Sequence, residues 1–146
     1  MLVIPHLILR KKDKILLTRR AKEAKWWAGH WHCGCGKIEH GETPREAIIR
    51  EAYEEIAITP NSPKLVTTIS LAENSILSQG TIFYAVELFF LSELFEDQEP
   101  YNNEPLKQDA MEWFSLTELP YPIIPVVKFG LQSFLKGDNY EEFKNV

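Results

Sequence analysis

The sequence of 146 residues is poor in cysteine, in long apolar runs and in positive charge. Its two cysteines, Cys33 and Cys35, are too close together to form an ordinary disulfide along a strand or turn, which excludes a disulfide-stabilised scaffold. No apolar run reaches the length of a membrane span. Acidic residues outnumber lysines and arginines by 21 to 16, and the net charge of −5 argues against a nucleic acid polymer or a membrane as partner.

The first residues do not have the order of a secretory signal, in which positive charge precedes an apolar stretch. Here the apolar residues come before the charges at 10–12, and Pro5 and His6 interrupt them. Together with the unpaired cysteines, this indicates a protein of the reducing cytoplasm. The length and the apolar content of 45 % suffice for one core, so we expect a single domain over residues 1–146.

Residues 36–58, GKIEHGETPREAIIREAYEEIAI, predict a glycine-bearing loop that turns into an acid-rich helix. Thr43 suits the N-cap, Pro44 suits the first helical position, and Glu46 stands three residues after the cap. This pattern predicts a helix from Pro44 to about Ile56.

Three glutamates of this helix fall on one side of it. At about 100° per residue, Glu51, Glu54 and Glu55 share one arc of roughly 100°. The neighbouring arc should face the core, and it holds Ile48, Ile49, Ala52 and Ile56. A bound divalent cation would relieve the repulsion, and oxygen ligands favour Mg²⁺, Mn²⁺ or Ca²⁺ over zinc. A solvated acidic face is the alternative, and the helix alone does not decide between them.

The spacing of the whole stretch resembles the Nudix box, G-x5-E-x7-R-E-U-x-E-E-x-G-U, in which U is a bulky or aliphatic apolar residue. Six of the seven positions of fixed identity match, and they are Gly36, Glu42, Arg50, Glu51, Glu54 and Glu55. The resemblance implies a hydrolase of nucleoside diphosphates linked to another moiety. It also implies Mg²⁺ or Mn²⁺ held by Glu51, Glu54 and Glu55.

Two departures from the family pattern lie at the ends of the box. Ala57 stands where the family has a glycine that leaves the helix with positive φ, and alanine costs on the order of 1 kcal/mol if that conformation is kept. Upstream, the chain reads Gly34-Cys35-Gly36-Lys37 where the family usually has Pro-Gly-Gly-Lys. The resemblance implies that the backbone carbonyl of Cys35 is a metal ligand.

Two arginines and two tryptophans are candidates for substrate binding. Arg19 and Arg20 end a predicted strand and would face an anionic ligand, although surface arginines are the more common case. Trp26 and Trp27 lie on a predicted loop, where they would either stack on a base or cap the core.

A local cluster of histidine and cysteine raises the alternative of a zinc site; its members are His30, His32, Cys33, Cys35 and His40. Cys-x-Cys beside His-x-His is a poor spacing for a closed tetrahedral site. We interpret the segment as a short strand whose residues alternate between two faces.

The remaining pattern predicts strands and one more helix. The strands are expected at 3–9, 15–19, 31–33, 64–73, 81–91 and 111–114, with a turn at 74–80 and a helix at 126–136. The apolar run 81–91 suits a central strand buried on both faces. Residues 137–146 should be either a frayed tail or a segment docked by its aromatic rings. This is a mixed α/β pattern, and the resemblance implies the Nudix α/β/α sandwich with a mixed sheet.

A second likeness lies in the acidic, irregular segment 93–105. Asn102-Asn103-Glu104-Pro105, followed by a strand that contains Trp113-Phe114, is similar to the N-x-E-P-x-K and W-F pattern of MutT-type Nudix enzymes. The similarity implies that Glu104 approaches the metals as a ligand or base. A proline-stiffened acidic loop is the alternative.

The sequence thus leads us to expect a metal-dependent pyrophosphohydrolase of small nucleotides. The resemblance implies that Arg50 orients the carboxylates and that Glu42 stabilises either the loop or a further metal, while Glu51, Glu54 and Glu104 remain candidates for the general base. The expected substrate is a nucleoside triphosphate or modified triphosphate, giving a monophosphate and pyrophosphate. An ADP-ribose or dinucleoside polyphosphate hydrolase and a non-catalytic nucleotide-binding module are the alternatives. Homodimers are frequent in the family.

Overall fold

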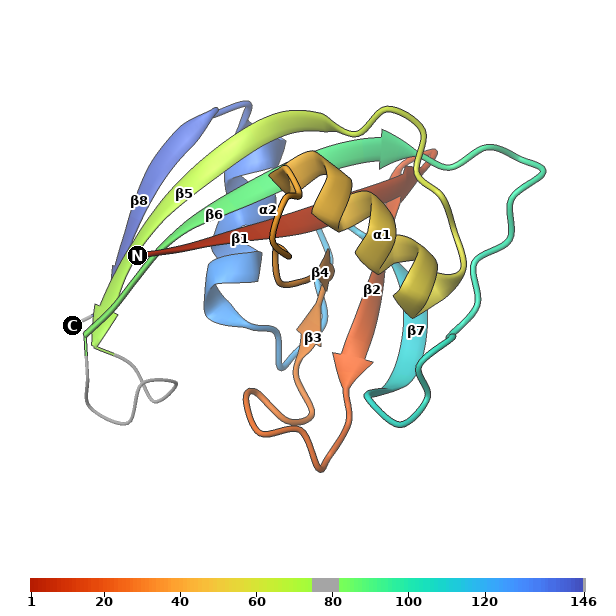
Figure 1. Cartoon of the computed structure of the whole chain (residues 1–146), viewed down its shortest axis with the longest axis horizontal. Helices are drawn as coiled ribbons and strands as arrows, with labels where there is room; N and C mark the ends of the chain where they lie inside the picture. The colour runs from red at the N-terminus through yellow and green to blue at the C-terminus, as the bar shows by residue number, and fades with distance from the viewer. Residues whose placement is uncertain (75–81, 146) are drawn as a thin grey trace.

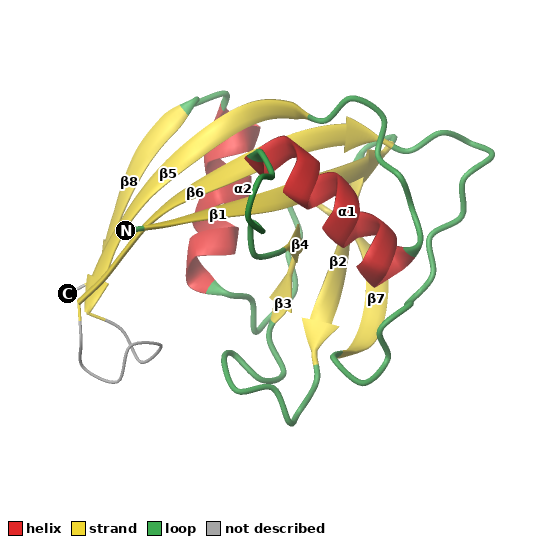
Figure 2. Cartoon of the chain, viewed as in Figure 1, coloured by secondary structure: helices red, strands yellow, loops and turns green. Residues whose placement is uncertain are grey.

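One mixed sheet with a helix on each face forms the framework of the chain (Figures 1 and 2). The structure is a computed structural model that describes residues 1–74 and 82–145. The helices are α1 (Pro44–Ile56) and α2 (Pro125–Lys136). The strands are β1 (Leu2–Lys11), β2 (Lys14–Arg20), β3 (Trp31–His32), β4 (Gly34–Cys35), β5 (Lys64–Asn74), β6 (Ile82–Glu93), β7 (Gln108–Ser115) and β8 (Tyr140–Asn145).

The sheet order is β3-β2-β1-β6-β5-β8, with β4 added to β1 and β7 added to β2. β1 and β6 run parallel at its centre, whereas β2 and β5 are antiparallel to them. A parallel pair needs a long connection, and here it contains the loop that carries the tryptophans, the acid-rich helix and β5. The short β4 pairs with β1 at His6 and Leu7, so it extends the sheet beside the middle of β1.

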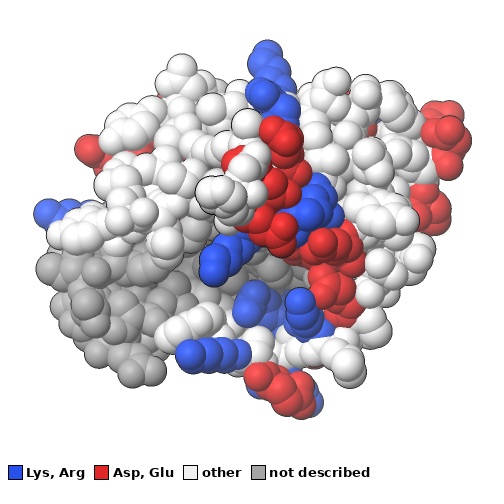
Figure 3. All heavy atoms as spheres, viewed as in Figure 1, with Lys and Arg blue, Asp and Glu red and all other residues white. Residues whose placement is uncertain are grey.

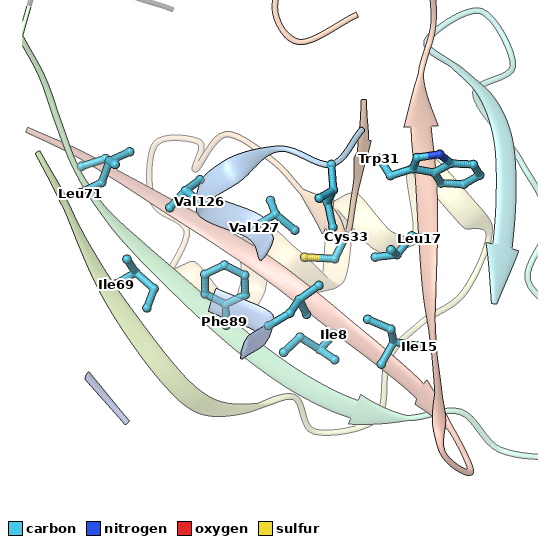
Figure 4. Packing of buried hydrophobic residues seen from close by; sticks show 13 residues of the cluster. Ile8, Ile15, Leu17, Trp31, Cys33, Ile69, Leu71, Phe89, Val126 and Val127 are labelled. Carbon is cyan, nitrogen blue, oxygen red and sulfur yellow. The ribbon is translucent and has the colours of Figure 1, made fainter. Parts of the chain in front are cut away.

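Alternation along the central strands builds one core on each face. On one face, α2 buries Val127 and Leu131 against Ile8 and Phe89, and Figure 4 shows this packing. On the other face, α1 buries Ile48, Ala52 and Ile56 against Leu7, Leu9 and Phe90. The expected α/β/α sandwich is confirmed, and the acid-rich helix is bound firmly to the sheet by its apolar side.

All six predicted strands are present, with their ends within two residues of the pattern except at the start of β7, which begins three residues earlier than predicted. Of the two alternatives for the tail, docking is the one observed. Residues 140–145 form β8, which pairs in parallel with β5, and Phe143 packs edge-on against Phe129 at 5.2 Å between ring centroids. One expectation needs correction, because α1 buries Ala47 completely and leaves Ile49 only half-buried.

The prediction that the central strand, β6, is buried on both faces is confirmed in part. Ala85, Glu87 and Phe89 on one face of β6 are buried, and so is Phe90 on the other, but Leu88 is only half-buried. The predicted turn at 74–80 lies outside the described residues, apart from Asn74 at the end of β5. In the described part of the chain, no helix is long and apolar enough to cross a membrane.

The ends of α1 follow from its flanking residues. The Thr43 hydroxyl accepts a hydrogen bond from the Glu46 N–H at 3.1 Å, and Pro44 takes the first helical position. At the other end Ala57 is left-handed, with φ 58° and ψ 32°, and its N–H donates to the Tyr53 carbonyl. The chain therefore keeps the exit conformation that suits glycine, although a side chain occupies the position.

We predict that Ala57→Gly stabilises the protein by about 0.5–1 kcal/mol, because glycine adopts the left-handed conformation without the steric cost of a Cβ atom. Equilibrium urea denaturation followed by circular dichroism measures the change. Ala52→Gly is the matched control, and it should destabilise, since Ala52 lies inside the helix and is buried. A lower free energy of unfolding for Ala57→Gly would show that the exit carries no strain.

Candidate functional site

The guanidinium group of Arg50 organises the acidic side of α1. Its Nε and Nη2 donate to the two carboxylate oxygens of Glu42 at 2.7 and 3.0 Å, and Nη2 also donates to the Lys37 carbonyl at 2.9 Å. Nη1 donates to Glu51 at 2.9 Å and lies 3.3 Å from Glu54. One side chain thus joins the glycine-bearing loop to the helix. These carboxylates raise the pKa of Arg50 further, so it stays charged.

Gly36 is needed because the Glu51 side chain passes directly over it. A Cβ atom at Gly36 would lie 2.0 Å from Cγ of Glu51, a distance at which one of the two residues must move. At Gly34 a Cβ atom would meet Glu55 Oε2 at 3.6 Å, which is ordinary contact. The segment of β4 therefore lies against the carboxylates of α1.

Glu55 is the carboxylate with the least compensation. Burial raises its pKa well above the ordinary value, and the neighbouring charges of Glu51 and Glu104 raise it further. Burial also raises the pKa of Glu51, although Arg50 acts in the opposite direction. A cluster of partly buried oxygen ligands with this excess of negative charge fits a hard divalent cation. The half-exposed Glu54 turns towards Arg50, and in the described residues no three His, Cys, Asp or Glu side chains are grouped closely enough to hold an ion.

The loop before β7 is attached to the carboxyl end of α1. The backbone N–H of Tyr101 donates to the Ile56 carbonyl, and that of Asn103 donates to the Glu55 carbonyl. The amide of Asn103 donates to the Glu54 carbonyl at 3.1 Å, and the amide of Gln108 donates to the Glu55 carbonyl at 2.9 Å. These carbonyls have no partner inside the helix, so the loop satisfies them.

This attachment places Glu104 beside Glu55. The backbone N–H of Glu104 donates to the Asn102 side chain at 3.1 Å, and its carboxylate pairs with Lys107 at 3.0 Å. Sequence reasoning had identified Glu104 but had assigned no role to Asn103 or Gln108. The unpaired carbonyls expected at any helix end, next to two adjacent asparagines, were the signal that could have found them.

A cavity of about 370 Å³ lies on the other face of the sheet, beside the start of α2. Its lining residues come from β1 to β6, the loop after β2 and the start of α2. They are Leu2, Ile4, His6, Arg20, Trp26, Trp27, His32, Cys35, Leu71, Glu87, Ile124, Pro125, Val126 and Val127. The size is at the lower end for small-molecule sites. Cys35 belongs to the strand that lies against Glu51 and Glu55, so the cavity adjoins the carboxylates across β4.

The four substrate-binding candidates separate into two groups. Trp26 and Trp27 line the cavity rather than the two cores, and Arg20 lines it too, with its Nε donating to the Trp26 carbonyl at 2.6 Å. Arg19 does not line the cavity. It pairs with Asp109 at 2.7 Å and lies 5.5 Å from the Trp31 ring centroid, as expected of a surface arginine.

The cavity contains a buried ion pair that sequence reasoning missed. His6 Nε2 lies 3.0 Å from Glu87 Oε2, and both residues are less than 5 % exposed. Burial alone would lower the pKa of His6, but the charge of Glu87 raises it to about 10. Burial and the charge of Arg20 lower the pKa of His32 to about 3, so His32 is neutral. The signal was a lone polar residue inside each of two apolar runs, LVIPHLIL and FYAVELFF.

Each of the two cysteines lies near a different histidine. Cys33 Sγ lies 3.9 Å from His6 Nδ1, whereas Cys35 Sγ lies 3.8 Å from His32 Nδ1. Burial raises the pKa of the Cys35 thiol well above its ordinary value, so the thiol stays protonated. The side chains alternate along the segment, as the interpretation as a short strand predicts.

Charge is distributed unevenly over the surface of this region. Acidic side chains gather over α1, and several basic side chains lie next to them on the same face (Figure 3). A ligand that carries phosphate would meet positive charge beside the acidic cluster, and it would need a cation within that cluster.

Known proteins resemble this chain in sequence and in overall fold. A family model described as NUDIX domain matches residues 2–132. The 8-oxo-dGTP diphosphatase of Escherichia coli (strain K12) is 44 % identical over 54 residues, which are 37 % of this chain and only 41 % of that protein. An RNA pyrophosphohydrolase of Mannheimia succiniciproducens is 24 % identical over 138 residues, covering 89 % of this chain and 68 % of that one. A solved MutT NUDIX hydrolase from Burkholderia pseudomallei superposes with a TM-score of 0.75 at 28 % identity, over 89 % of this chain and 95 % of the other.

We predict that Glu55→Gln stabilises the metal-free protein at pH 8 by on the order of 1 kcal/mol for each unit by which the folded-state pKa is raised. The folded-state pKa lies above the ordinary value of 4.5, so Glu55 lowers stability progressively as the pH rises from 4.5 to that folded-state pKa. In EDTA, the stability of Glu55→Gln relative to wild type should therefore increase with pH over this range, because the other titrating groups, His6 and His32 included, are present in both proteins. Urea denaturation across this pH range measures both.

Glu54→Gln is the control, because Glu54 is half-exposed and paired with Arg50. It should leave the pH slope unchanged. An equal slope in wild type and Glu55→Gln would mean that Glu55 is not the strained carboxylate. With Mg²⁺ added, wild type should gain stability and Glu55→Gln should gain little.

Proposed function

The chain belongs to the Nudix family, and from this premise we propose that it is a Mg²⁺- or Mn²⁺-dependent hydrolase of a pyrophosphate linkage in a small nucleotide. The observation that carries the proposal is the adjacency of an undercompensated carboxylate cluster and a cavity of ligand size, separated only by β4. A nucleotide has the matching parts, a base for the cavity and phosphates for a metal held by the carboxylates.

The ligands proposed for the metal are Glu51, Glu54 and Glu55, with the backbone carbonyl of Cys35. When bound, the cation would supply a Lewis acid for the phosphate oxygens and lower the pKa of a water molecule. Glu51 and Glu55 are the strongest candidates because burial disfavours their charge in the metal-free chain. Glu54 would have to turn away from Arg50 to join them.

The protein side chains have distinct parts in the reaction. Water adds to one phosphorus while the bond to the bridging oxygen breaks, so a carboxylate must take the proton that water releases. Glu51, Glu54 and Glu104 are the candidates, and Glu104 is supported by its attachment next to Glu55. Arg50 is proposed as a positioning residue, since its guanidinium already holds Glu42, Glu51 and the Lys37 carbonyl. Glu42 holds Arg50 and, through an N–H of Glu39 at 2.9 Å, the loop.

The preferred substrate in this proposal is a nucleoside triphosphate or a modified triphosphate, cleaved to a monophosphate and pyrophosphate. Trp26 and Trp27 at the cavity supply flat apolar surface for a base. Arg20, which lines the cavity and whose charge also acts on Cys35, suits the phosphate nearest the nucleoside. Arg19 is not part of this proposal because Asp109 already pairs with it.

Two alternatives stay open to experiment. An ADP-ribose or dinucleoside polyphosphate hydrolase would use the same metal chemistry with a longer binding site. A non-catalytic nucleotide-binding module would keep the cavity and lose turnover. The complete set of acids in the box favours an enzyme over that module.

The test is a substrate panel incubated with Mg²⁺ or Mn²⁺ and analysed by chromatography. It should hold nucleoside triphosphates and their oxidised forms, ADP-ribose and diadenosine polyphosphates. We predict turnover of at least one triphosphate to monophosphate and pyrophosphate, with kcat/KM more than about tenfold above that for ADP-ribose or the dinucleotides. This ratio corresponds to roughly 1.4 kcal/mol in transition-state binding.

Glu104→Gln should lower kcat for the same substrate with little change in KM, whereas Glu99→Gln in the exposed part of the loop should behave like wild type. A preference for ADP-ribose or a dinucleotide would overturn the substrate proposal and leave the hydrolase. Nucleotide binding without any turnover would favour the non-catalytic module.

A further inference from the structure

The floor of the cavity holds a charged group that the hydrolysis does not use. Glu87 on β6 and His6 on β1 are neighbours across the central parallel pair, where Glu87 is in register with Ile4 and His6 with Phe89. The ring of Phe89 stacks on His6 at 4.5 Å between centroids. Both charged residues line the cavity, yet neither belongs to the carboxylate cluster on α1.

Both ring nitrogens of His6 already have neighbours. Nε2 lies 3.0 Å from Glu87 Oε2, and Nδ1 lies 3.9 Å from Cys33 Sγ. His6 therefore has no N–H left for a ligand. Glu87 differs, because its second oxygen, Oε1, has no hydrogen-bond partner in the part of the chain that the structure describes. The pair consequently presents a hydrogen-bond acceptor to the cavity, and no donor.

The surroundings of this acceptor make it important for the choice of ligand. Its walls next to the pair are largely apolar, with Ile4, Leu71 and Val126 among them. A carboxylate oxygen without a partner in such surroundings is costly, unless a ligand donates to it. Arg20 and His32 also line the cavity, and the Trp27 indole N–H is buried without a partner in the described part of the chain. Apolar walls and tryptophan rings would accept any flat base, whereas the Glu87 oxygen is an acceptor that distinguishes a base edge rich in donors.

We propose that Glu87 selects the base, and that it selects a ring with two adjacent N–H donors on one edge, one for the free Oε1 and one for the remaining lone pair of Oε2. A ring N–H next to an exocyclic amino group satisfies this requirement. Guanine and the pterins share this 2-amino-4-oxopyrimidine edge. The inference rests on the proposed function for its phosphates, but the recognition concerns the base alone.

The other common bases fit the acceptor less well. Adenine and cytosine place a ring nitrogen lone pair beside their amino group, and that lone pair would face the carboxylate. Uracil and thymine flank their single N–H with two carbonyl oxygens. A site built to hydrogen-bond a substrate N–H rejects an analogue that lacks it by as much as about 10⁴-fold, whereas apolar pockets discriminate by only about 10–200-fold.

The direct test uses wild-type protein in EDTA, where the metal plays no part. Isothermal titration calorimetry would compare guanosine and neopterin with inosine, 1-methylguanosine and adenosine. We expect guanosine or neopterin to bind at least tenfold more tightly than the other three. The tighter of the two shows whether the base of the substrate is a guanine or a pterin. If neither binds more tightly than adenosine, the proposal is wrong.

A variant links the preference to Glu87. Glu87→Met removes the acceptor and keeps the length of the side chain, and Leu71→Met is the control because it puts the same side chain into the same cavity. The preference for the two-donor edge should fall below about threefold in Glu87→Met and persist in Leu71→Met. An unchanged preference in a folded Glu87→Met, as judged by circular dichroism, would overturn the assignment. If that variant does not fold, the wild-type comparison decides alone.

Failure of this inference is distinguishable from failure of the proposed function. Turnover of triphosphates with equal kcat/KM for all bases, together with unselective nucleoside binding, would contradict the role of Glu87 and leave the hydrolase intact. Selective nucleoside binding without turnover of any nucleotide would support Glu87 and contradict the enzyme.

Discussion

The arrangement of the site depends on one guanidinium group, that of Arg50. It satisfies both oxygens of Glu42, the Lys37 carbonyl and an oxygen of Glu51 at distances between 2.7 and 3.0 Å. Without it, the acids of the loop and the helix would repel one another at close range. Its fixed planar geometry can join loop and helix in a way that a single ammonium group cannot. Because Arg50 faces Glu42 and Glu51, it leaves Glu55 uncompensated, and this local excess of negative charge is what a cation would relieve.

The two faces of the sheet supply different parts of the proposed reaction. α1 packs on one face and holds the acids, while the cavity opens on the other beside α2. The two-residue strand β4 connects them, since Cys35 lines the cavity and Gly34 and Gly36 on either side of it touch the glutamates. The loop before β7 completes the acidic side, because Asn103 and Gln108 hold it on the free carbonyls at the end of α1. Phosphate chemistry and base recognition can therefore vary independently in this fold.

Local patterns predicted the elements well. The cap at Thr43, the proline start and the apolar spacing gave the bounds of α1, and the alternating runs gave the strands. The segment after Gly137 was missed because β8 owes its order to pairing with β5, which no local pattern reveals. The same limit applies to the site. Spacing along one helix predicted Glu51, Glu54 and Glu55, but the partnership of His6 with Glu87 joins residues 81 apart in the chain. Arg20 lines the cavity and Arg19 does not, because Arg19 pairs with Asp109 on the neighbouring strand β7. No local pattern reveals this pairing.

The central claim is that Arg50 holds the carboxylates of α1 as a site for a divalent cation. Electron paramagnetic resonance of Mn²⁺ titrated into wild type and Arg50→Lys tests it most directly. Lysine keeps the charge and loses the planar fork, so a folded Arg50→Lys should bind Mn²⁺ about 10–100-fold more weakly than wild type. Equal Mn²⁺ affinity in the two proteins, or no Mn²⁺ binding by wild type, would contradict the claim.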